Sequence, residues 1–233
     1  MKDFKTLVSE SAKVHGHLCP GQIIGVRMAI LGCRLIGLDD PTCHDQIKKL
    51  IVYIEMDRCA GDAVAHVTGV KLGRRSLKFA DYGIMAATFI NLSTNSVFRI
   101  ISTEEARALA PYYAPEVAGK SAQQLEAYKL MPDSVLFRVQ KVSVKLNDYD
   151  MPGPTRKKRT CSRCGQVVRD QREVIIDNNQ NFFSLRFSKS DKEFRCASAT
   201  NSIIGAAPRF IIETLGVVSI ALIALYLTKD GGN

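Results

Sequence analysis

The amino-acid sequence predicts an α+β fold, a two-layer arrangement of helices and a mixed or antiparallel sheet. The chain has 233 residues, 46% of them hydrophobic, which is enough to bury a substantial core. Between residues 3 and 36 the apolar residues recur at helical spacing, and from Leu77 onward they recur at a period of two. Helical and strand patterns alternate up to about residue 150, so we expect one domain over residues 1–150.

Local signals set the order of the elements. Pro20 suits the first position of a helix, Gly37 suits a helix stop, and Ser102-Thr-Glu-Glu105 is a capping box. Helices are therefore expected over residues 3–13, 20–36, 59–69, 102–110 and 121–130. Strands are expected over 51–56, 77–79, 84–92, 97–101 and 135–146, with a polar loop over 38–49.

The C-terminal part differs in composition from the first domain. Residues 151–176 read as a linker followed by a partial zinc ribbon, and residues 177–233 as a long helix followed by an apolar helix. The segment 210–227 would be about 27 Å long as a helix, close to the thickness of a bilayer core. It predicts a transmembrane helix, and a buried core helix is the alternative.

The charge and the cysteines limit the classes of function. The net charge is +9, but much of the excess lies between Arg156 and Arg172, which is typical of a solvated linker. Trp is absent and aromatic residues are few, so nucleic acid is not an expected partner. The seven cysteines are an odd number with no apolar leader before them, which favours a cytoplasmic protein with reduced thiols.

One short segment concentrates residues of the metal-ligand type. His15, His17 and Cys19 alternate, so an extended segment would point all three the same way. Zinc, or another divalent transition metal, accepts imidazole nitrogen and thiolate sulfur together. Cys59 is the best candidate for a fourth ligand, because it falls between a predicted strand and a predicted helix. Cys19 and Cys59 would then both lie at helix N-termini, where the pKa of a thiol falls. A coincidence of loop residues is the alternative.

Other candidate ligands in this part of the chain have structural explanations. Cys33 falls inside an apolar helix, and Cys43 and His44 fall in the polar loop. His66 reads as a helix histidine with a local partner.

Several motifs, in order, resemble the FmdE family, named for the E subunit of formylmethanofuran dehydrogenase. They are His15-Gly-His-Leu-Cys-Pro-Gly21, VYIEMDRCAGDA at 52–63, LGRRSLKFADYGIMAATF at 72–89, and Asp150-Met-Pro-Gly-Pro154. The resemblance implies a two-layer α+β fold, a homodimer, and a metal site, typically of zinc, at His15, His17, Cys19 and Cys59.

The resemblance also places the stretch Leu77–Gly83 near that metal. Lys78 and Asp81 would then bind or polarise a small substrate, and a surface ion pair is the alternative. Ile84 stands where the family often has a lysine, so this chain lacks any chemistry that depends on it.

Cys161-Ser-Arg-Cys164-Gly165 has the form of a zinc knuckle, but only half of a zinc ribbon is present. Cys196 follows alone, with Ala199 where a second pair would need its partner. We expect weak metal binding by Cys161 and Cys164 unless a second chain supplies ligands. From about residue 177 the chain resembles a fragment of the membrane domain of an ABC-type exporter, which suggests a chimera.

These observations support two functions. The first is a metal-binding protein that binds or acts on a small one-carbon or pterin-type ligand, as in the one-carbon metabolism of anaerobes and in methanogenesis. The second is a non-enzymatic metal carrier or accessory subunit of a molybdenum or tungsten enzyme, docking its partner through the basic knuckle. A membrane-anchored regulator is a third reading. The resemblance assigns the redox step to other subunits, so any catalysis here would be metal-assisted.

Overall fold

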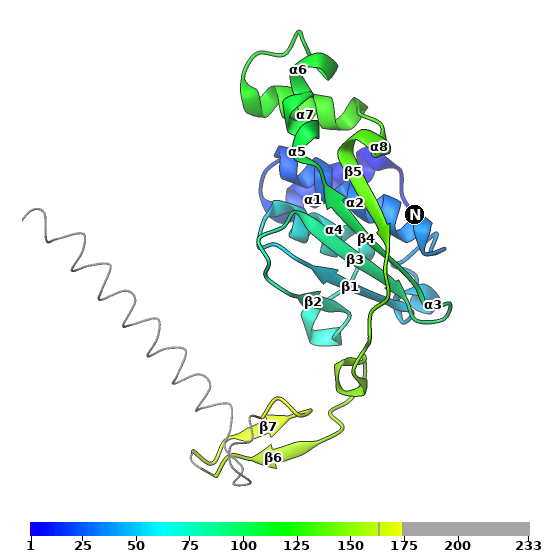
Figure 1. The fold of residues 1–233 in the computed structure, drawn as a ribbon, viewed down its shortest axis with the longest axis vertical. Helices are drawn as coiled ribbons and strands as arrows, with labels where there is room; N and C mark the ends of the chain where they lie inside the picture. Colours follow the sequence, from blue (N-terminus) through cyan, green and yellow to red (C-terminus); the bar gives the residue numbers. More distant parts are fainter. Residues whose placement is uncertain (163, 174–233) are drawn as a thin grey trace, which may run out of the picture. The chain divides into compact units, whose positions relative to one another are not determined.

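The computed structural model describes residues 1–162 and 164–173 of the chain. The chain divides after Pro154 into two compact units. Figure 1 shows the fold, coloured along the sequence.

The first unit alternates helices and strands as the sequence predicts. Its helices are α1 (Phe4–His15), α2 (Pro20–Leu35), α3 (His44–Ile47), α4 (Cys59–Thr68), α5 (Glu104–Ala108), α6 (Ala110–Tyr113), α7 (Lys120–Leu130) and α8 (Asp133–Leu136), with short 3-10 turns η1 (Leu72–Arg74) and η2 (Asp148–Asp150). Its strands are β1 (Leu50–Ile54), β2 (Leu77–Phe79), β3 (Ala86–Asn91), β4 (Ser96–Ser102) and β5 (Phe137–Lys141).

The five strands form one mixed sheet in the order β2-β1-β3-β4-β5. Only β2 runs parallel to its neighbour β1, with Tyr53 opposite Lys78, and the other pairs are antiparallel. The prediction of a mixed sheet with helices is confirmed for this unit.

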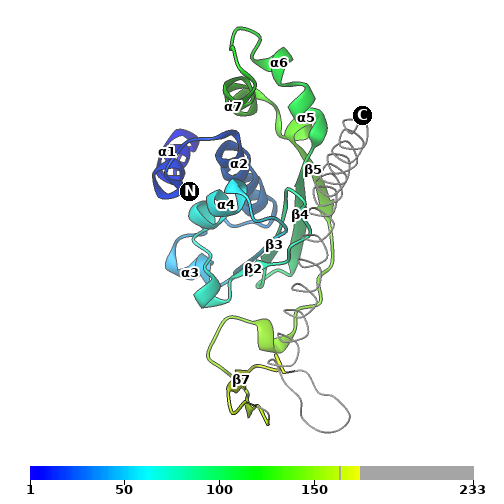
Figure 2. The same cartoon turned by 90° about the vertical axis from the view of Figure 1, so that its left-hand side faces the viewer.

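Helices α1, α2 and α4 lie on one side of the sheet, as Figure 2 shows. The main core lies there, with Phe89 from the sheet and Ile23 and Met28 from α2 completely buried. On the other face, Ile51, Ile90 and Val97 form a smaller apolar cluster, against which the segment from Val142 to Met151 packs. The chain after β5 thus covers the second face of the sheet.

Three local expectations are corrected. The strand expected over 135–146 is β5 only. Helix α8 ends at Leu136, and after Val142, whose N–H still donates to Val97, the chain leaves the sheet edge to cover the second apolar cluster. The cap of the helix after β4 is Thr103, whose hydroxyl accepts the N–H of Ala106. The loop expected over 38–49 contains the short helix α3.

The closest helix packing lies between α2 and α4. A Cβ on Gly25 would lie 2.6 Å from the Cβ of Ala63, so only glycine allows this approach. Gly21 faces Cys59 one turn earlier on both helices, which shows that α2 and α4 run in the same direction. Their N-termini therefore lie together, and both carry a cysteine.

The second unit begins with a small hairpin. Strands β6 (Lys158–Thr160) and β7 (Val167–Arg169) pair antiparallel. The Asp170 carboxylate accepts the N–H groups of Arg156 and Lys157, and Arg159 pairs with Glu173 at 3.1 Å.

The predictions for the tail fall outside the described residues. These are the long helix from residue 177, the exporter-like stretch and the transmembrane helix over 210–227. In the part of the chain that the structure describes, no helix is both long enough and apolar enough to span a bilayer.

Candidate metal centre

His15, His17 and Cys19 come together between α1 and α2. Their candidate ligand atoms all lie within 4.8 Å of one another. The His15 and His17 rings are tilted by 41° with their centroids 4.7 Å apart. The structure thus gathers the three residues that the alternating motif singled out.

The expected cause of this clustering is wrong. His15 is the last residue of α1, and Gly16 caps that helix in the left-handed region at φ 96°. Cys19 is extended and is the N-cap of α2. A turn between two helices, which needs Gly16, therefore brings the three side chains together instead of a single extended segment.

Cys59 lies beside this cluster at the first position of α4. A Cβ on Gly21 would lie 3.1 Å from the Cβ of Cys59 and 3.7 Å from the Sγ of Cys19. The buried Gln22 fixes the start of α4, because its amide donates to the carbonyl of Cys59 at 2.6 Å. Gln22 in turn accepts a hydrogen bond from Ser11 of α1.

The pKa of Cys59 departs from the expectation for a helix N-terminus. Burial, and next the neighbouring Cys19 thiol, raise the pKa of the Cys59 thiol above its usual value. These effects outweigh the backbone hydrogen bond at Cys59, which lowers the pKa of the thiol. A metal ion at the thiols would reverse this direction, and its binding would release a proton.

His15 is held by a residue that the motif did not indicate. Its Nδ1 lies 2.9 Å from a carboxylate oxygen of Asp62, which is on the same helix as Cys59. Its Nε2 is buried and has no hydrogen-bond partner within residues 1–162 and 164–173. A carboxylate on one ring nitrogen and a free second nitrogen is the arrangement of a metal-binding histidine.

Sequence reasoning could have found Asp62. It follows Cys59 by three positions, so both lie on one face of the predicted helix 59–69. The link to His15 is a contact between distant segments, which one sequence does not reveal.

A cavity of about 530 Å³ adjoins the cluster. His15, Cys59 and Asp62 lie on its wall, together with Arg58. Its apolar lining comes from β1, β2 and their flanks and comprises Ile54, Met56, Leu72, Leu77 and Phe79.

The structure does not bring Lys78 and Asp81 into this cluster. Lys78 alternates with Leu77 and Phe79 along β2, and its ammonium donates to the carbonyl of Asp150 at 2.5 Å. Asp81 is exposed and accepts the N–H of Gly83 at 3.2 Å. Both side chains thus contact backbone groups outside the cluster.

The Cys161–Gly165 knuckle in the second unit lies between the paired strands β6 and β7. The N–H of Gly165 donates to the carbonyl of Cys161 at 3.0 Å, with Gly165 in the left-handed region. Cys161 is buried, whereas Cys164 is exposed. Cys196 lies outside the described residues.

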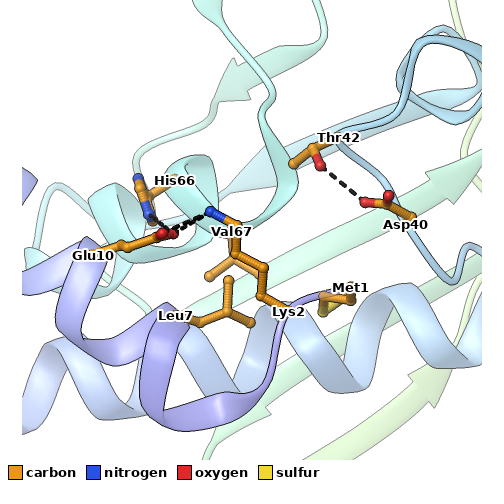
Figure 3. A pocket seen from close by; sticks show the side chains of 8 residues that line it. All are labelled: Met1, Lys2, Leu7, Glu10, Asp40, Thr42, His66 and Val67. Atoms are coloured by element: carbon orange, nitrogen blue, oxygen red, sulfur yellow. Dashed lines mark hydrogen bonds and ion pairs between the residues drawn. The ribbon is translucent and has the colours of Figure 1, made fainter.

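A second cavity, of about 570 Å³, lies near the start of the chain (Figure 3). Its polar side chains have partners within the cavity. Glu10 pairs with Lys2 at 2.6 Å and lies 3.7 Å from His66. The Thr42 hydroxyl donates to Asp40 at 2.9 Å. This supports a structural role for His66, as the sequence suggested.

Comparisons with known proteins agree with the fold. An FmdE-like protein of the tungsten formylmethanofuran dehydrogenase type, from Syntrophus aciditrophicus, is similar in structure, with a TM-score of 0.53 and 17% identity. The match covers 79% of this chain and 92% of that one. At this identity the likeness concerns the fold alone.

A curated relative matches over a shorter stretch. It is the "Probable S-adenosyl-L-methionine-binding protein" of Archaeoglobus fulgidus, 30% identical over 84 residues. The match covers 36% of this chain and 23% of the relative, so the chain spans less than a quarter of the relative's length.

The match to a family model is broader. The family described as "FmdE, Molybdenum formylmethanofuran dehydrogenase operon" matches residues 14–144, which is more than half of the chain and includes the whole His/Cys cluster. The chain therefore belongs to the FmdE family.

Proposed function

We propose that the chain binds one divalent transition metal, zinc in the first instance, through His15, His17, Cys19 and Cys59. The observation that carries this proposal is the Nε2 of His15. Among the described residues it is buried without a partner beside two other metal-type side chains, while Asp62 lies against the opposite ring nitrogen. A buried polar atom left unpaired is costly unless something in the working protein binds it.

The donor set fits the metal. Two imidazoles and two thiols are a common zinc set, and thiolates disfavour magnesium or calcium. With a metal on Nε2, Asp62 would hold the proton on Nδ1 and so keep His15 in the tautomer that a ligand needs. When bound, the metal would supply Lewis-acid chemistry or a fixed point of attachment for a ligand.

The cavity beside the cluster supports a small-molecule ligand at the same site. Its volume of about 530 Å³ falls within the ~300–1,000 Å³ typical of small-molecule sites. Apolar walls with Arg58 and the metal ligands at one side suit a compound with a flat apolar part and a polar end, as in a one-carbon or pterin-type compound. S-adenosyl-L-methionine, after which the A. fulgidus relative is named, is a further candidate to test.

A second function is an accessory role without catalysis, as a metal carrier or a subunit of a molybdenum or tungsten enzyme. The family description supports this role. The hydrogen bond of Lys78 also supports this role, because its ammonium donates to a backbone carbonyl outside the cluster. In this role the basic hairpin around Cys161 would dock the partner enzyme.

Metal content of the full chain tests the site. We expect Cys59→Ser and His15→Ala each to lose about one zinc ion per chain relative to the unchanged protein, by elemental analysis after dialysis. Cys43→Ser, at a half-buried cysteine away from the cluster, is the matched control and should keep its zinc. Equal zinc content in Cys59→Ser and Cys43→Ser would overturn the four-ligand assignment.

Visible spectra of the cobalt-substituted chain separate the two functions. A ligand that enters the metal site changes the cobalt spectrum, whereas a pure carrier shows no change with S-adenosyl-L-methionine or a pterin and transfers its metal to an acceptor. Sedimentation of the same sample tests the proposed homodimer, and fractionation of cells tests a cytoplasmic location against a membrane anchor.

A further inference from the structure

A third cavity, of about 370 Å³, lies outside the metal centre and carries a different chemistry. It lies between α3, the turn η1 and the chain just after η2. Basic side chains from two of these segments meet there, namely His44, Lys48 and Arg74. None of these residues was singled out as part of a site by sequence reasoning.

The cations of Lys48 and Arg74 in this cavity are not neutralised by a carboxylate of the described residues. Within residues 1–162 and 164–173, neither Lys48 nor Arg74 has a carboxylate within 4.0 Å or a side-chain hydrogen bond. His44 has only Asp45, at 3.3 Å, and the side chain of Asp45 is 90% exposed. By contrast, in the cavity of Figure 3 the Lys2 ammonium and the His66 ring both lie against the carboxylate of Glu10.

The remaining walls leave room for more than a single ion. Ile47 and Pro152 supply apolar surface, and Gly73 and Gly153 contribute no side chain. A Cβ on Gly73 would meet no atom within 4 Å, so the space in front of it is open. A volume of about 370 Å³ is at the lower end of the ~300–1,000 Å³ found for small-molecule sites.

We propose that this cavity binds the phosphoryl group of a small phosphorylated molecule. Lys48 and Arg74 would hold the phosphate oxygens, Arg74 with two N–H groups and Lys48 as a point charge. Ile47 and Pro152 would contact the apolar part of the same ligand. The two cavities share no lining residue: Leu72 lines the metal-side cavity, while Gly73 and Arg74 of the same turn line this one.

A small molecule fits better than a nucleic acid. A nucleic-acid surface combines a long positive groove with aromatic side chains that stack on bases. Here the cations converge on one cavity, and no aromatic ring other than that of His44 lies among its lining residues.

Calorimetric titration of the full chain tests this site. The probes are inorganic phosphate, adenosine 5′-monophosphate, adenosine and a short single-stranded oligonucleotide. The variant is the double substitution Lys48→Gln/Arg74→Gln. Its control is Lys5→Gln/Lys141→Gln, which removes the same charge from two exposed lysines outside the cavity.

We expect adenosine 5′-monophosphate to bind and adenosine not to bind. Each neutralised cation should weaken binding about tenfold, so the double variant should lose about a hundredfold while the control stays near the unchanged protein. Binding of inorganic phosphate alone would identify the free ion as the source of the phosphoryl group, and tighter binding of the nucleotide would identify a phosphate ester.

Three results would overturn the proposal. The first is equal affinity for adenosine 5′-monophosphate in the double variant and its control. The second is equal affinity of the unchanged protein for adenosine and for its monophosphate. The third is an affinity for the oligonucleotide that exceeds the affinity for the monophosphate and falls equally in both double variants. Zinc content, measured on the same samples, should not change, so failure here is distinguishable from failure of the metal site.

Discussion

Replacing Asp62 with asparagine isolates the contribution of the carboxylate behind His15. The side chain keeps its size and an oxygen that can accept from Nδ1 of His15, but it loses its negative charge. The 2.9 Å contact between Nδ1 and the carboxylate is the only described hydrogen bond of the His15 ring in residues 1–162 and 164–173. The substitution therefore leaves the four proposed ligands in place and weakens only the group that orients one of them.

The expected loss of zinc affinity is about tenfold. Removing such outer carboxylates typically costs about 10- to 100-fold in metal affinity. The His15 side chain is 15% exposed but that of Asp62 is 68% exposed, so water already screens the carboxylate and can replace part of its effect. The low end of the range applies, and a tenfold loss corresponds to about 1.4 kcal/mol.

Competition with a chromophoric zinc chelator measures this difference on the full chain. Asp45→Asn is the matched control, because it removes a carboxylate from beside another histidine, His44, at 3.3 Å. We expect Asp62→Asn to release zinc at a lower chelator concentration than Asp45→Asn. If both variants and the unchanged protein hold zinc equally, Asp62 does not orient a metal ligand, and the assignment of Nε2 of His15 to the metal loses one of its two supports.

Two further predictions concern helix α2, which carries both Gly25 and Cys33. Gly25→Ala should lower the free energy of unfolding by about 1–3 kcal/mol and weaken zinc binding, because its Cβ would lie 2.6 Å from the Cβ of Ala63 and push α2 away from α4. Gly73→Ala, with no atom within 4 Å of its Cβ, should change stability by less than about 0.5 kcal/mol, and equal urea midpoints for the two variants would contradict this packing. Burial raises the pKa of Cys33 from 9.0 to about 12, so the folded protein keeps this thiol neutral while the unfolded chain ionises it. The contribution of Cys33 to the free energy of unfolding should therefore be intact below pH 9 and fall as the pH rises toward 12, by about 1.4 kcal/mol at pH 10. In urea titrations, Cys33→Ala should lose correspondingly less unfolding free energy than the unchanged protein between about pH 8 and about pH 10.

Periodicity predicted most of the first unit. The helices α1, α2, α4 and α7 and the strands β1 to β4 all lie within a few residues of their expected bounds, because each follows one apolar pattern with a clear start or stop. The end of β5 was not predictable in this way. Its alternating pattern continues to Leu146 and so predicts a longer strand. In the structure, these alternating apolar residues cover the apolar cluster around Ile90 instead.

The site was predictable in composition but not in geometry. Spacing alone singled out His15, His17 and Cys19, and the helix pattern placed Cys59 at an N-terminus. The turn at Gly16 was missed, because alternate spacing also fits an extended segment. Asp62 was missed because its partner is distant in sequence, and the surroundings of Lys78 depend on a contact with the chain near Asp150.

The parallel packing of α2 against α4 has a consequence for metal binding and dissociation. Many structural zinc sites exist only when the ion draws separate segments together, so that losing the ion unfolds the domain. Here Gly21, Gly25 and Gln22 hold the two cysteine-bearing helix ends in register by packing and hydrogen bonding within the protein itself. The metal site would therefore be preformed in the folded protein. The ion could bind and dissociate while the chain stays folded.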